Sequence, residues 1–474
     1  MFLRSAVATI IVLLAASAFA ADSTPRPQLP AFPPLSSQDR LLVLAPHEDD
    51  ETLGAGGLIQ QALSLRAAVR VVYLTYGDHN ELAFLFFRKR PWLTPGVNRA
   101  MGEVRRGEAI QAMAHLGLAA ENLVFCGYPD NGTLTIWKQH WKQAPPLHSF
   151  LTNTRRVPYK DAFSYGKSYK GEEIVADLER LLLDFRPTRI LVTHPLDANP
   201  DHRALYLFLQ VALLNLEGHI PAAQVFSYPI HMGAWPRPLR YHPESWLTLP
   251  QVLVEEPAAD YLFELSDDQV RMKYEAIRSY RSQTADHNYW LVAFARRNEL
   301  FSVVKPTLLE REHHVAAANW SRTKKLVPIP DSEPAEPAEP APATNQVAGV
   351  TFRQSKDGLL VQLSFRRPID EDLQVGIFEF GYRRDRPFPA MPKLDIQWDD
   401  GSVTVRDQTA TVRDSGLQAS ESKSKLVLMT PWTTLGLPDA VFVQVQGVVQ
   451  EVPVSQTGWQ VLLRAPFASP RSKP

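Results

Sequence analysis

Cysteine, net charge and long hydrophobic runs are the features that this 474-residue chain has little of. The single cysteine, Cys126, excludes an internal disulfide, and its place after the apolar run 123–125 is typical of a core residue. The 50 basic and 51 acidic residues give a net charge of −1. No overall field therefore attracts nucleic acid or an anionic membrane, and a ligand must be recognised locally. After the N-terminal segment, no stretch reaches the roughly 18 apolar residues of a membrane span.

The first 20 residues have the pattern of a secretory signal peptide. Arg4 supplies the positive start, residues 6–16 form a short apolar region, and Ala18-Phe19-Ala20 gives the small residues of a cleavage site. The sequence therefore predicts export to a secreted or periplasmic location, with no membrane span after cleavage. An uncleaved anchor is the alternative interpretation.

Short β-type runs alternate with longer helical patterns from Asp39 onward. Such alternation indicates βαβ units and a mostly parallel sheet with helices on both faces, so we predict a Rossmann-like α/β domain over residues 36–325. Strands are expected at 40–45, 69–75, 122–126, 189–193 and 224–228, and helices at 53–65, 103–116, 172–184 and 201–214.

A segment rich in proline, glutamate and alanine, residues 327–346, is typical of an extended spacer between domains. After it the pattern changes to period-two runs separated by turns such as Asp357-Gly358 and Asp400-Gly401. This pattern predicts an all-β, sandwich-like domain over residues 347–470, which either binds a polymer or packs on the first domain. A spacer of this kind also implies few contacts between the domains, so we expect the first domain to fold alone.

Five consecutive ionisable residues follow the first predicted strand, in the run Pro46-His47-Glu48-Asp49-Asp50-Glu51. Ligands of open α/β sheets bind where strands end, and His47 and Asp50 can face one point from a turn. The alternative is that the carboxylates merely cap the next helix. That alternative explains Asp49 or Glu51 alone but not the adjacent histidine.

A second polar cluster, residues 193–203, follows the predicted strand 189–193 and ends in Asp201-His202-Arg203. Since the ends of parallel strands share one edge of a sheet, this loop can meet the first one. His47, Asp50 and His202 would then form a three-ligand site with an open position, as in catalytic zinc sites, where a bound water has a pKa near 7. Asp49, beside a ligand, is suited to take the proton of that water.

These two loops resemble those of the PIG-L (LmbE-like) zinc-dependent N-deacetylase family. Weaker matches in the right order support the resemblance: Gly77-Asp78, Arg105-Arg106-x-Glu108, Gly127-Tyr128-x-Asp130, Lys273-x-x-Ala276 and Asn298-Glu299. The family removes acetyl groups from N-acetylated amino sugars, such as N-acetylglucosamine-type glycoconjugates. The resemblance implies that His47, Asp50 and His202 are the zinc ligands, that Asp49 is the general base, and that the substrate is an N-acetylated sugar or glycan.

Two positions depart from the family pattern. Glu48 stands where proline is common, and we expect it to face solvent with little effect. Asn199 stands where a histidine commonly stabilises the oxyanion and assists the leaving amine; asparagine can donate a hydrogen bond there but cannot supply a proton. His231, after the strand 224–228, is the best placed substitute, with His194 and His79 as other candidates and Asp49 as a base that later acts as the acid.

The aromatic insertions 78–102 and 132–170 either line a cleft in which sugar rings stack or pack a satellite core. Two other functions stay open at this point. One is a metallo-phosphoesterase, which Arg203 would suit although a second set of metal ligands is missing from the motifs. The other is a catalytically inactive glycan-binding protein, which the asparagine at position 199 makes conceivable.

Overall fold

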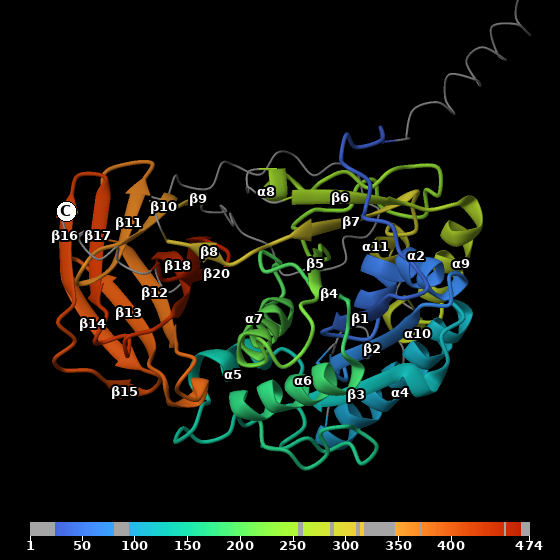
Figure 1. Ribbon diagram of the computed structural model, residues 1–474, viewed down its shortest axis with the longest axis horizontal. Coiled ribbons are helices and arrows are strands. Elements are labelled where there is room, and N and C mark those ends of the chain that lie inside the picture. The colour runs from blue at the N-terminus through green and yellow to red at the C-terminus, as the bar shows by residue number, and fades with distance from the viewer. Residues whose placement is uncertain are drawn as a thin grey trace, which may run out of the picture.

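The computed structural model describes residues 24–79, 94–254, 259–284, 289–309, 313–316, 347–369, 372–449 and 452–465 (Figure 1). The predicted signal peptide and the predicted linker lie outside these residues. Within the described ranges, no helix has both the length and the apolar character needed to cross a membrane.

A seven-stranded sheet with the order β3-β2-β1-β4-β5-β7-β6 forms the centre of the N-terminal half. The first five strands in this order run parallel, while β7 is antiparallel to both of its neighbours. The prediction of a mostly parallel, Rossmann-like sheet is confirmed. The strands are β1 (Arg40–Ala45), β2 (Ala68–Thr75), β3 (Leu123–Tyr128), β4 (Arg189–Thr193), β5 (Gln224–Tyr228), β6 (Ala259–Glu264) and β7 (Asn298–Val303).

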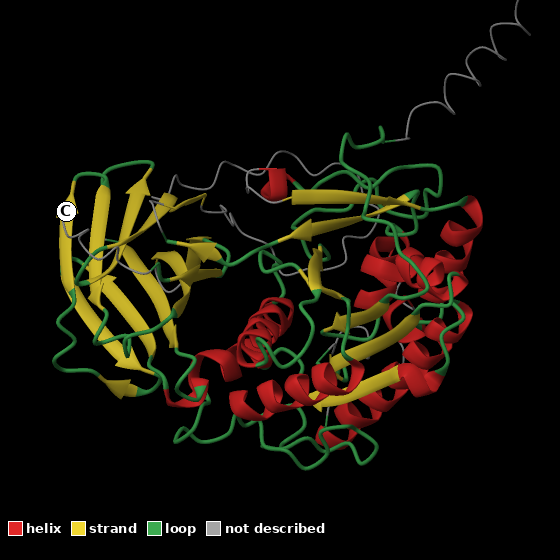
Figure 2. Cartoon of the chain, viewed as in Figure 1, coloured by secondary structure: helices red, strands yellow, loops and turns green. Residues whose placement is uncertain are grey.

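Helices cover both faces of this sheet, as Figure 2 shows. On one face α2 (Asp50–Ser64) and α4 (Pro95–His115) pack with α9 (Asp267–Ile277), and on the other α5 (Thr133–Gln139) and α6 (Gly171–Phe185) pack with α7 (Pro200–Asn215). Three single-turn helices are α8 (Gln251–Val254), α10 (Arg281–Thr284) and α11 (Tyr289–Val292).

Helix α4 begins before the expected residue 103. Thr94 is its N-cap and accepts a hydrogen bond from the Val97 N–H at 3.3 Å, and Pro95 occupies the first turn, where its missing N–H costs nothing. The first insertion is therefore shorter than the sequence pattern suggested.

Helix α2 lies unusually close to the sheet. A Cβ atom on Gly54 would stand 2.1 Å from Cδ2 of Tyr228 on β5, a separation that no side chain tolerates. The glycine thus lets the first turn of α2 approach the ends of the central strands, where the ionisable run lies.

The C-terminal part consists of two sheets that are antiparallel except where β8 pairs with β20, which confirms the predicted all-β region. The sheet β16-β17-β11-β10-β9 faces the sheet β15-β14-β13-β12-β18-β20-β8, with β19 beside β18. The strands are β8 (Thr307–Leu308), β9 (His313–Ala316), β10 (Val347–Gln354), β11 (Gly358–Phe365), β12 (Leu373–Tyr382), β13 (Lys393–Asp399), β14 (Ser402–Asp407), β15 (Ala410–Thr411), β16 (Gln418–Ser422), β17 (Lys425–Pro431), β18 (Ala440–Val449), β19 (Val452–Gln456) and β20 (Gln460–Leu463). Because β8 and β9 precede the predicted linker yet pair with β20 and β10, the β structure begins before the expected boundary at residue 325.

The β region and the α/β domain share one continuous core, contrary to the expectation of few contacts. Strand β12 is buried on both faces: Val375 and Ile377 point into the sandwich, while Phe378 and Phe380 point toward the α/β domain. Trp137 of α5 lies 5.4 Å from Phe380 and 5.3 Å from Phe208 of α7, measured between ring centroids. Figure 1 shows α5 and α7 on the side of the α/β domain that faces the sandwich.

The second insertion supplies part of this shared core. Trp137 and Trp141 are fully buried, and Tyr159 and Tyr169 are also buried. These four rings therefore pack in the interior, as the satellite-core interpretation expected, although Tyr159 also borders a surface hollow. Residues 80–93 of the first insertion lie outside the described ranges.

Deletion of residues 328–474 should destabilise the α/β domain rather than leave it unchanged. It would expose the rings around Trp137 and Trp141, and burying a large aromatic side chain contributes on the order of 2–3 kcal/mol. We expect the fragment 21–327 to aggregate or to unfold at a lower temperature in thermal melts. A matched control is a full chain cut by a protease at a site engineered within 327–346, whose two pieces should stay associated. An equal melting temperature for fragment and intact chain would contradict the shared core.

Candidate metal centre

Both predicted loops lie at the carboxyl ends of adjacent parallel strands. His47 follows β1 and the second loop follows β4, and these strands are neighbours in the sheet. Strand order reverses between β1 and β4, because the chain runs outward to β2 and β3 on one side and to β5 on the other. This is the topological switch point, where open α/β sheets bind ligands.

The first loop turns sharply at Asp49 before α2 begins. Asp49 has φ 153°, which is strained for a residue with a side chain, and its carboxylate makes no capping hydrogen bond to the helix. Its backbone N–H donates to Oε2 of Glu51 at 3.2 Å instead. Since strain of this kind gathers at functional sites and the side chain does not cap, the capping interpretation does not account for Asp49.

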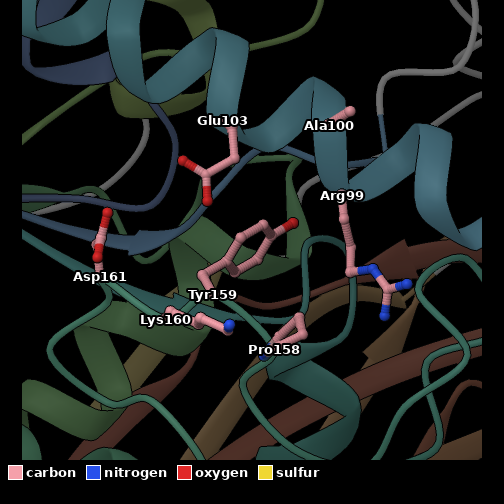
Figure 3. Close-up of a pocket in the computed structure, with 7 residues that line it drawn as sticks. All are labelled: Arg99, Ala100, Glu103, Pro158, Tyr159, Lys160 and Asp161. Carbon is pink, nitrogen blue, oxygen red and sulfur yellow. The ribbon is translucent and has the colours of Figure 1, made fainter.

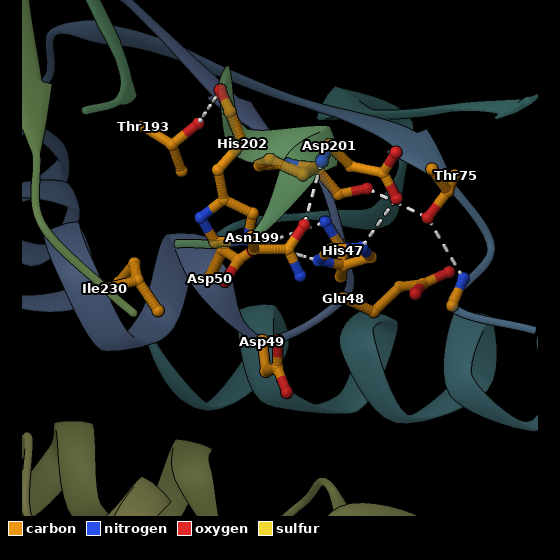
Figure 4. A network of polar contacts seen from close by, with 12 residues as sticks. His47, Glu48, Asp49, Asp50, Thr75, Thr193, Asn199, Asp201, His202 and Ile230 are labelled. Carbon is orange, nitrogen blue, oxygen red and sulfur yellow. Dashed lines mark hydrogen bonds and ion pairs between the residues drawn. The ribbon is translucent and has the colours of Figure 1, made fainter. Parts of the chain in front are cut away.

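The second loop fixes His202 in the first turn of α7. Asn199 is the N-cap, and its Oδ1 accepts the Asp201 N–H at 2.8 Å, while Pro200 occupies the first helical position. The Thr193 hydroxyl donates to the His202 carbonyl at 3.0 Å. The imidazole therefore points from a rigid helix start toward the first loop (Figure 4).

Three buried donor atoms from the two loops converge. Oδ2 of Asp50 lies 3.2 Å from Nδ1 of His47 and 3.1 Å from Nε2 of His202, and the two nitrogens are 3.3 Å apart. With bonds of about 2.0–2.1 Å, two donors of a tetrahedral zinc site stand about 3.3 Å apart. The triangle therefore has the size that a tetrahedral metal ion requires, and its two imidazoles and one carboxylate are ligands that zinc takes.

Carboxylates hold the outer ring nitrogens of both histidines. Nε2 of His47 contacts Oδ1 of Asp130 at 3.1 Å and Oδ2 of Asp201 at 3.3 Å, and Nδ1 of His202 lies 3.0 Å from Oδ2 of Asp197. Such partners fix the ring orientation and tautomer of metal-binding histidines. Asp130 and Asp201 stand in the sequence motifs and Asp197 lies in the loop 193–203, but the sequence alone assigns these aspartates no role, because only the fold brings them against the two histidines.

The site carries more negative than positive charge. Burial opposes protonation of His47, but Asp130, Asp201 and Asp50 outweigh it and raise its pKa well above the usual range. Burial likewise opposes charge on His202, and Asp197 and Asp50 raise its pKa to about 9. Four carboxylates thus surround two imidazoles, an arrangement that calls for a cation.

Metal binding should release protons, because the two histidines hold protons in the metal-free protein. The protonated forms dominate below a pKa of about 9 for His202, so metal affinity should rise as pH rises toward that value. Calorimetry in buffers of different ionisation enthalpy measures the number released, expected to be about one or more per metal ion near neutral pH. Proton uptake, or affinity independent of pH, would contradict these histidines as ligands.

Asp49 differs from its neighbours in being partly accessible and in having a carboxylate that lies apart from the donor triangle (Figure 4). Burial raises its pKa to about 7, against the opposing effect of the Arg105 guanidinium, whose Nη2 lies 3.6 Å from Oδ2 of Asp49. A carboxyl with this pKa can both accept and return a proton near neutral pH.

Glu48 is buried, so the expectation that it faces solvent is wrong. Its side chain is fully inaccessible, burial raises its pKa well above the usual range, and its ion-pair contact is with Nε of Arg105 at 3.5 Å. Arg105 also donates to the carbonyls of Glu48 and Gly77, at 3.1 and 3.2 Å. Glu48 and Arg105 therefore form part of the support of the first loop.

The candidates for the missing histidine have different surroundings. The ring of His231 lies 4.9 Å from that of His202 and stacks on Trp290, also at 4.9 Å between centroids. Burial lowers the pKa of His231 to about 4. Nδ1 of His194 accepts the Leu196 N–H at 3.1 Å, and the His79 backbone N–H donates to Asp130 at 2.9 Å. His231 is thus the candidate in ring contact with the donor set.

A surface hollow of about 280 Å³ lies between α4 and residues 158–161 of the second insertion (Figure 3). The hydroxyl of Tyr159 donates to Oδ2 of Asp78 at 2.5 Å, and burial raises the pKa of Asp78 to about 7. The hollow is lined by Arg99, Ala100, Glu103, Pro158, Tyr159, Lys160 and Asp161.

Fold and site together describe a doubly wound α/β domain with a candidate metal centre at its switch point. Residues 42–213, within the α/β domain, match the family described as "PIG-L: GlcNAc-PI de-N-acetylase". The resemblance seen in the sequence motifs is therefore confirmed.

The chain is also similar to individual proteins, in sequence or in structure. A 1D-myo-inositol 2-acetamido-2-deoxy-alpha-D-glucopyranoside deacetylase of Mycobacterium sp. (strain KMS) is 28% identical over 296 residues, covering 60% of this chain and 83% of the relative. A deacetylase of the same description from Saccharopolyspora erythraea is 31% identical over 175 residues, covering 35% of this chain and 51% of the relative. The N,N'-diacetylchitobiose deacetylase of Pyrococcus horikoshii has 18% identity and a TM-score of 0.33, covering 52% of this chain and 72% of that one.

Proposed function

We propose that this protein is an exported, zinc-dependent hydrolase that removes the acetyl group from an N-acetylated amino sugar of the N-acetylglucosamine type. One observation carries the proposal: His47, Asp50 and His202 present three donor atoms at tetrahedral spacing, with Asp49 beside them. The family match and deacetylase relatives support the reaction class. The signal-type N-terminus supports export.

The metal ion and the residues around the donor triangle would have different roles in amide hydrolysis. When bound, zinc would lower the pKa of a water and polarise the acetyl carbonyl. Asp49 takes the proton of the attacking water as the new C–O bond forms at the carbonyl carbon. The C–N bond then breaks, the amine nitrogen receives a proton, and acetate and the free amino sugar leave.

We infer that Asp49 returns the proton to the amine. Its pKa of about 7 allows Asp49 both to accept and to return a proton. His231 has a pKa of about 4, so it is neutral at neutral pH and cannot act as a general acid. His231 can still donate an N–H hydrogen bond to the oxyanion. So can the Nδ2 amide of Asn199, because the Oδ1 of that side chain already caps α7.

Replacement of His231 separates these roles. His231→Ala should lower turnover by roughly 10²-fold through loss of an oxyanion donor, with zinc retained and the shape of the pH–rate profile kept. His231→Gln, which keeps an N–H donor, should recover part of the loss. If His231→Ala removes the alkaline limb of the profile, His231 rather than Asp49 is the general acid.

The function itself is tested by acetate release. Purified mature protein should contain zinc and release acetate from an N-acetylglucosamine conjugate, with an equal amount of free amine. A matched phosphate ester should give no phosphate under the same conditions. Phosphate release without acetate would replace the proposal with a phosphoesterase. Sugar binding without either product would make the protein a glycan-binding protein.

A further inference from the structure

The β region contacts the second metal loop, residues 193–203, directly. Oε1 of Gln456, the last residue of β19, accepts a hydrogen bond from Nη1 of Arg203 at 3.2 Å. Two residues later, Gly458 packs against Leu196 so closely that a Cβ atom would stand 2.6 Å from Cδ2 of that leucine. The turn after β19 thus contacts the second metal loop near its start, at Leu196, and at its end, at Arg203.

Both contact points adjoin groups of the candidate metal centre. Arg203 follows His202, whose Nε2 belongs to the donor triangle. Leu196 precedes Asp197, whose Oδ2 lies 3.0 Å from Nδ1 of the same histidine and accepts the His231 N–H at 2.9 Å. A displacement of Arg203 would therefore reach His202 through the backbone, and a displacement of Leu196 would reach it through the side chain of Asp197.

The turn that makes these contacts is itself rigid. The Thr457 N–H donates to the Val445 carbonyl at 2.8 Å, and the Val445 N–H donates to the Thr457 hydroxyl at 3.0 Å. Trp459 is buried next to Phe380, with 5.6 Å between ring centroids. The sandwich therefore presents Gln456 and Gly458 from a fixed position beside β18.

The aromatic residues of the β region do not form a sugar-binding face. Within its described strands and turns, Trp398, Trp432 and Trp459 are all buried. The described large apolar residues that are exposed there, Leu308 and Leu437, are aliphatic. Stacking on sugar rings requires exposed aromatic faces, so this part of the structure favours packing over polymer binding.

We propose that the β region is a clamp on the active site, in which Gln456 and Gly458 are positioning residues that hold the second metal loop and so set the affinity for zinc. This role rests on the proposed metal site. It assigns to the sandwich a part in forming the centre itself, through the orientation of His202.

Zinc affinity of the full-length chain, measured by chelator competition, tests the clamp without any substrate. Gln456→Ala should weaken zinc binding by roughly tenfold, the low end of the range for outer partners of metal ligands. Gly458→Ala should do the same by displacing Leu196. Gln418→Ala, on exposed β16, and Gly107→Ala, where a Cβ meets no atom within 4 Å, are matched controls and should bind zinc like the parent.

A double-mutant cycle separates positioning from general destabilisation. Arg203→Ala should weaken zinc binding to a similar extent, and Gln456→Ala should add little on top of it, because both remove one contact. Activity of each variant should recover when zinc is raised to saturation. Unchanged zinc affinity in a folded Gln456→Ala and Gly458→Ala would overturn the clamp, and a raised KM with unchanged zinc affinity would make this edge a substrate-binding surface. Failure of the parent chain to bind zinc would instead refute the metal site on which the clamp rests.

Discussion

Replacement of His202 by alanine should remove metal and activity together. His202 supplies one corner of a donor triangle with sides of 3.1 to 3.3 Å, and it is completely buried, so water cannot readily replace its nitrogen. With two donors left, zinc affinity should fall by at least about 100-fold. Metal content after dialysis and acetate release measure both effects on one sample.

His47→Ala should give the same result, because His47 supplies a second corner. His219→Ala is the control, since this histidine lies exposed after α7 and outside the site. Full zinc occupancy in both His47→Ala and His202→Ala would show that the ligands lie elsewhere.

Asp49→Asn should have the opposite pattern, with metal retained and turnover lost. The Asp49 carboxylate lies outside the donor triangle and makes no capping hydrogen bond to α2. Asparagine keeps its shape but cannot accept a proton, so kcat should fall by roughly 10²–10⁴-fold. Loss of metal from this variant would mean that Asp49 rather than Asp50 is the ligand.

The pH dependence of the parent enzyme gives an independent test of Asp49. Its carboxyl must be ionised to act as a base, and its pKa is about 7 in the metal-free protein. A bound cation lowers that pKa, so kcat/KM of the zinc enzyme should fall with decreasing pH along a limb that lies below about 7. Arg105→Gln should move it to higher pH, because Arg105 holds the pKa of Asp49 down, whereas Arg106→Gln should leave it in place.

Features that depend on a local sequence pattern could be predicted from the sequence. Strands β1, β4 and β5 have the predicted bounds because short apolar runs followed by polar loops are typical of buried parallel strands. The two metal loops could be placed on one edge of the sheet because parallel strands share that edge. Each loop is a short continuous segment, so its cluster of histidine and carboxylate residues is visible in the sequence.

Features set by tertiary packing could not be predicted in this way. The burial of strand β12 on both faces could not be predicted, because its second face packs against the α/β domain, which is distant in sequence. The burial of Glu48 depends on Arg105, which comes from the distant helix α4. The contacts of Gln456 and Gly458 with the second metal loop join segments more than two hundred residues apart, and no local pattern marks them.

Titration of the metal-free enzyme with zinc tests the central claim most directly. After removal of metal by a chelator, acetate release from an N-acetylglucosamine conjugate should be negligible. It should then rise in proportion to added zinc and level off at about one zinc ion per chain, the stoichiometry of a three-ligand catalytic site. Acetate release that persists without metal, or zinc uptake at that stoichiometry with no acetate released, would contradict the account.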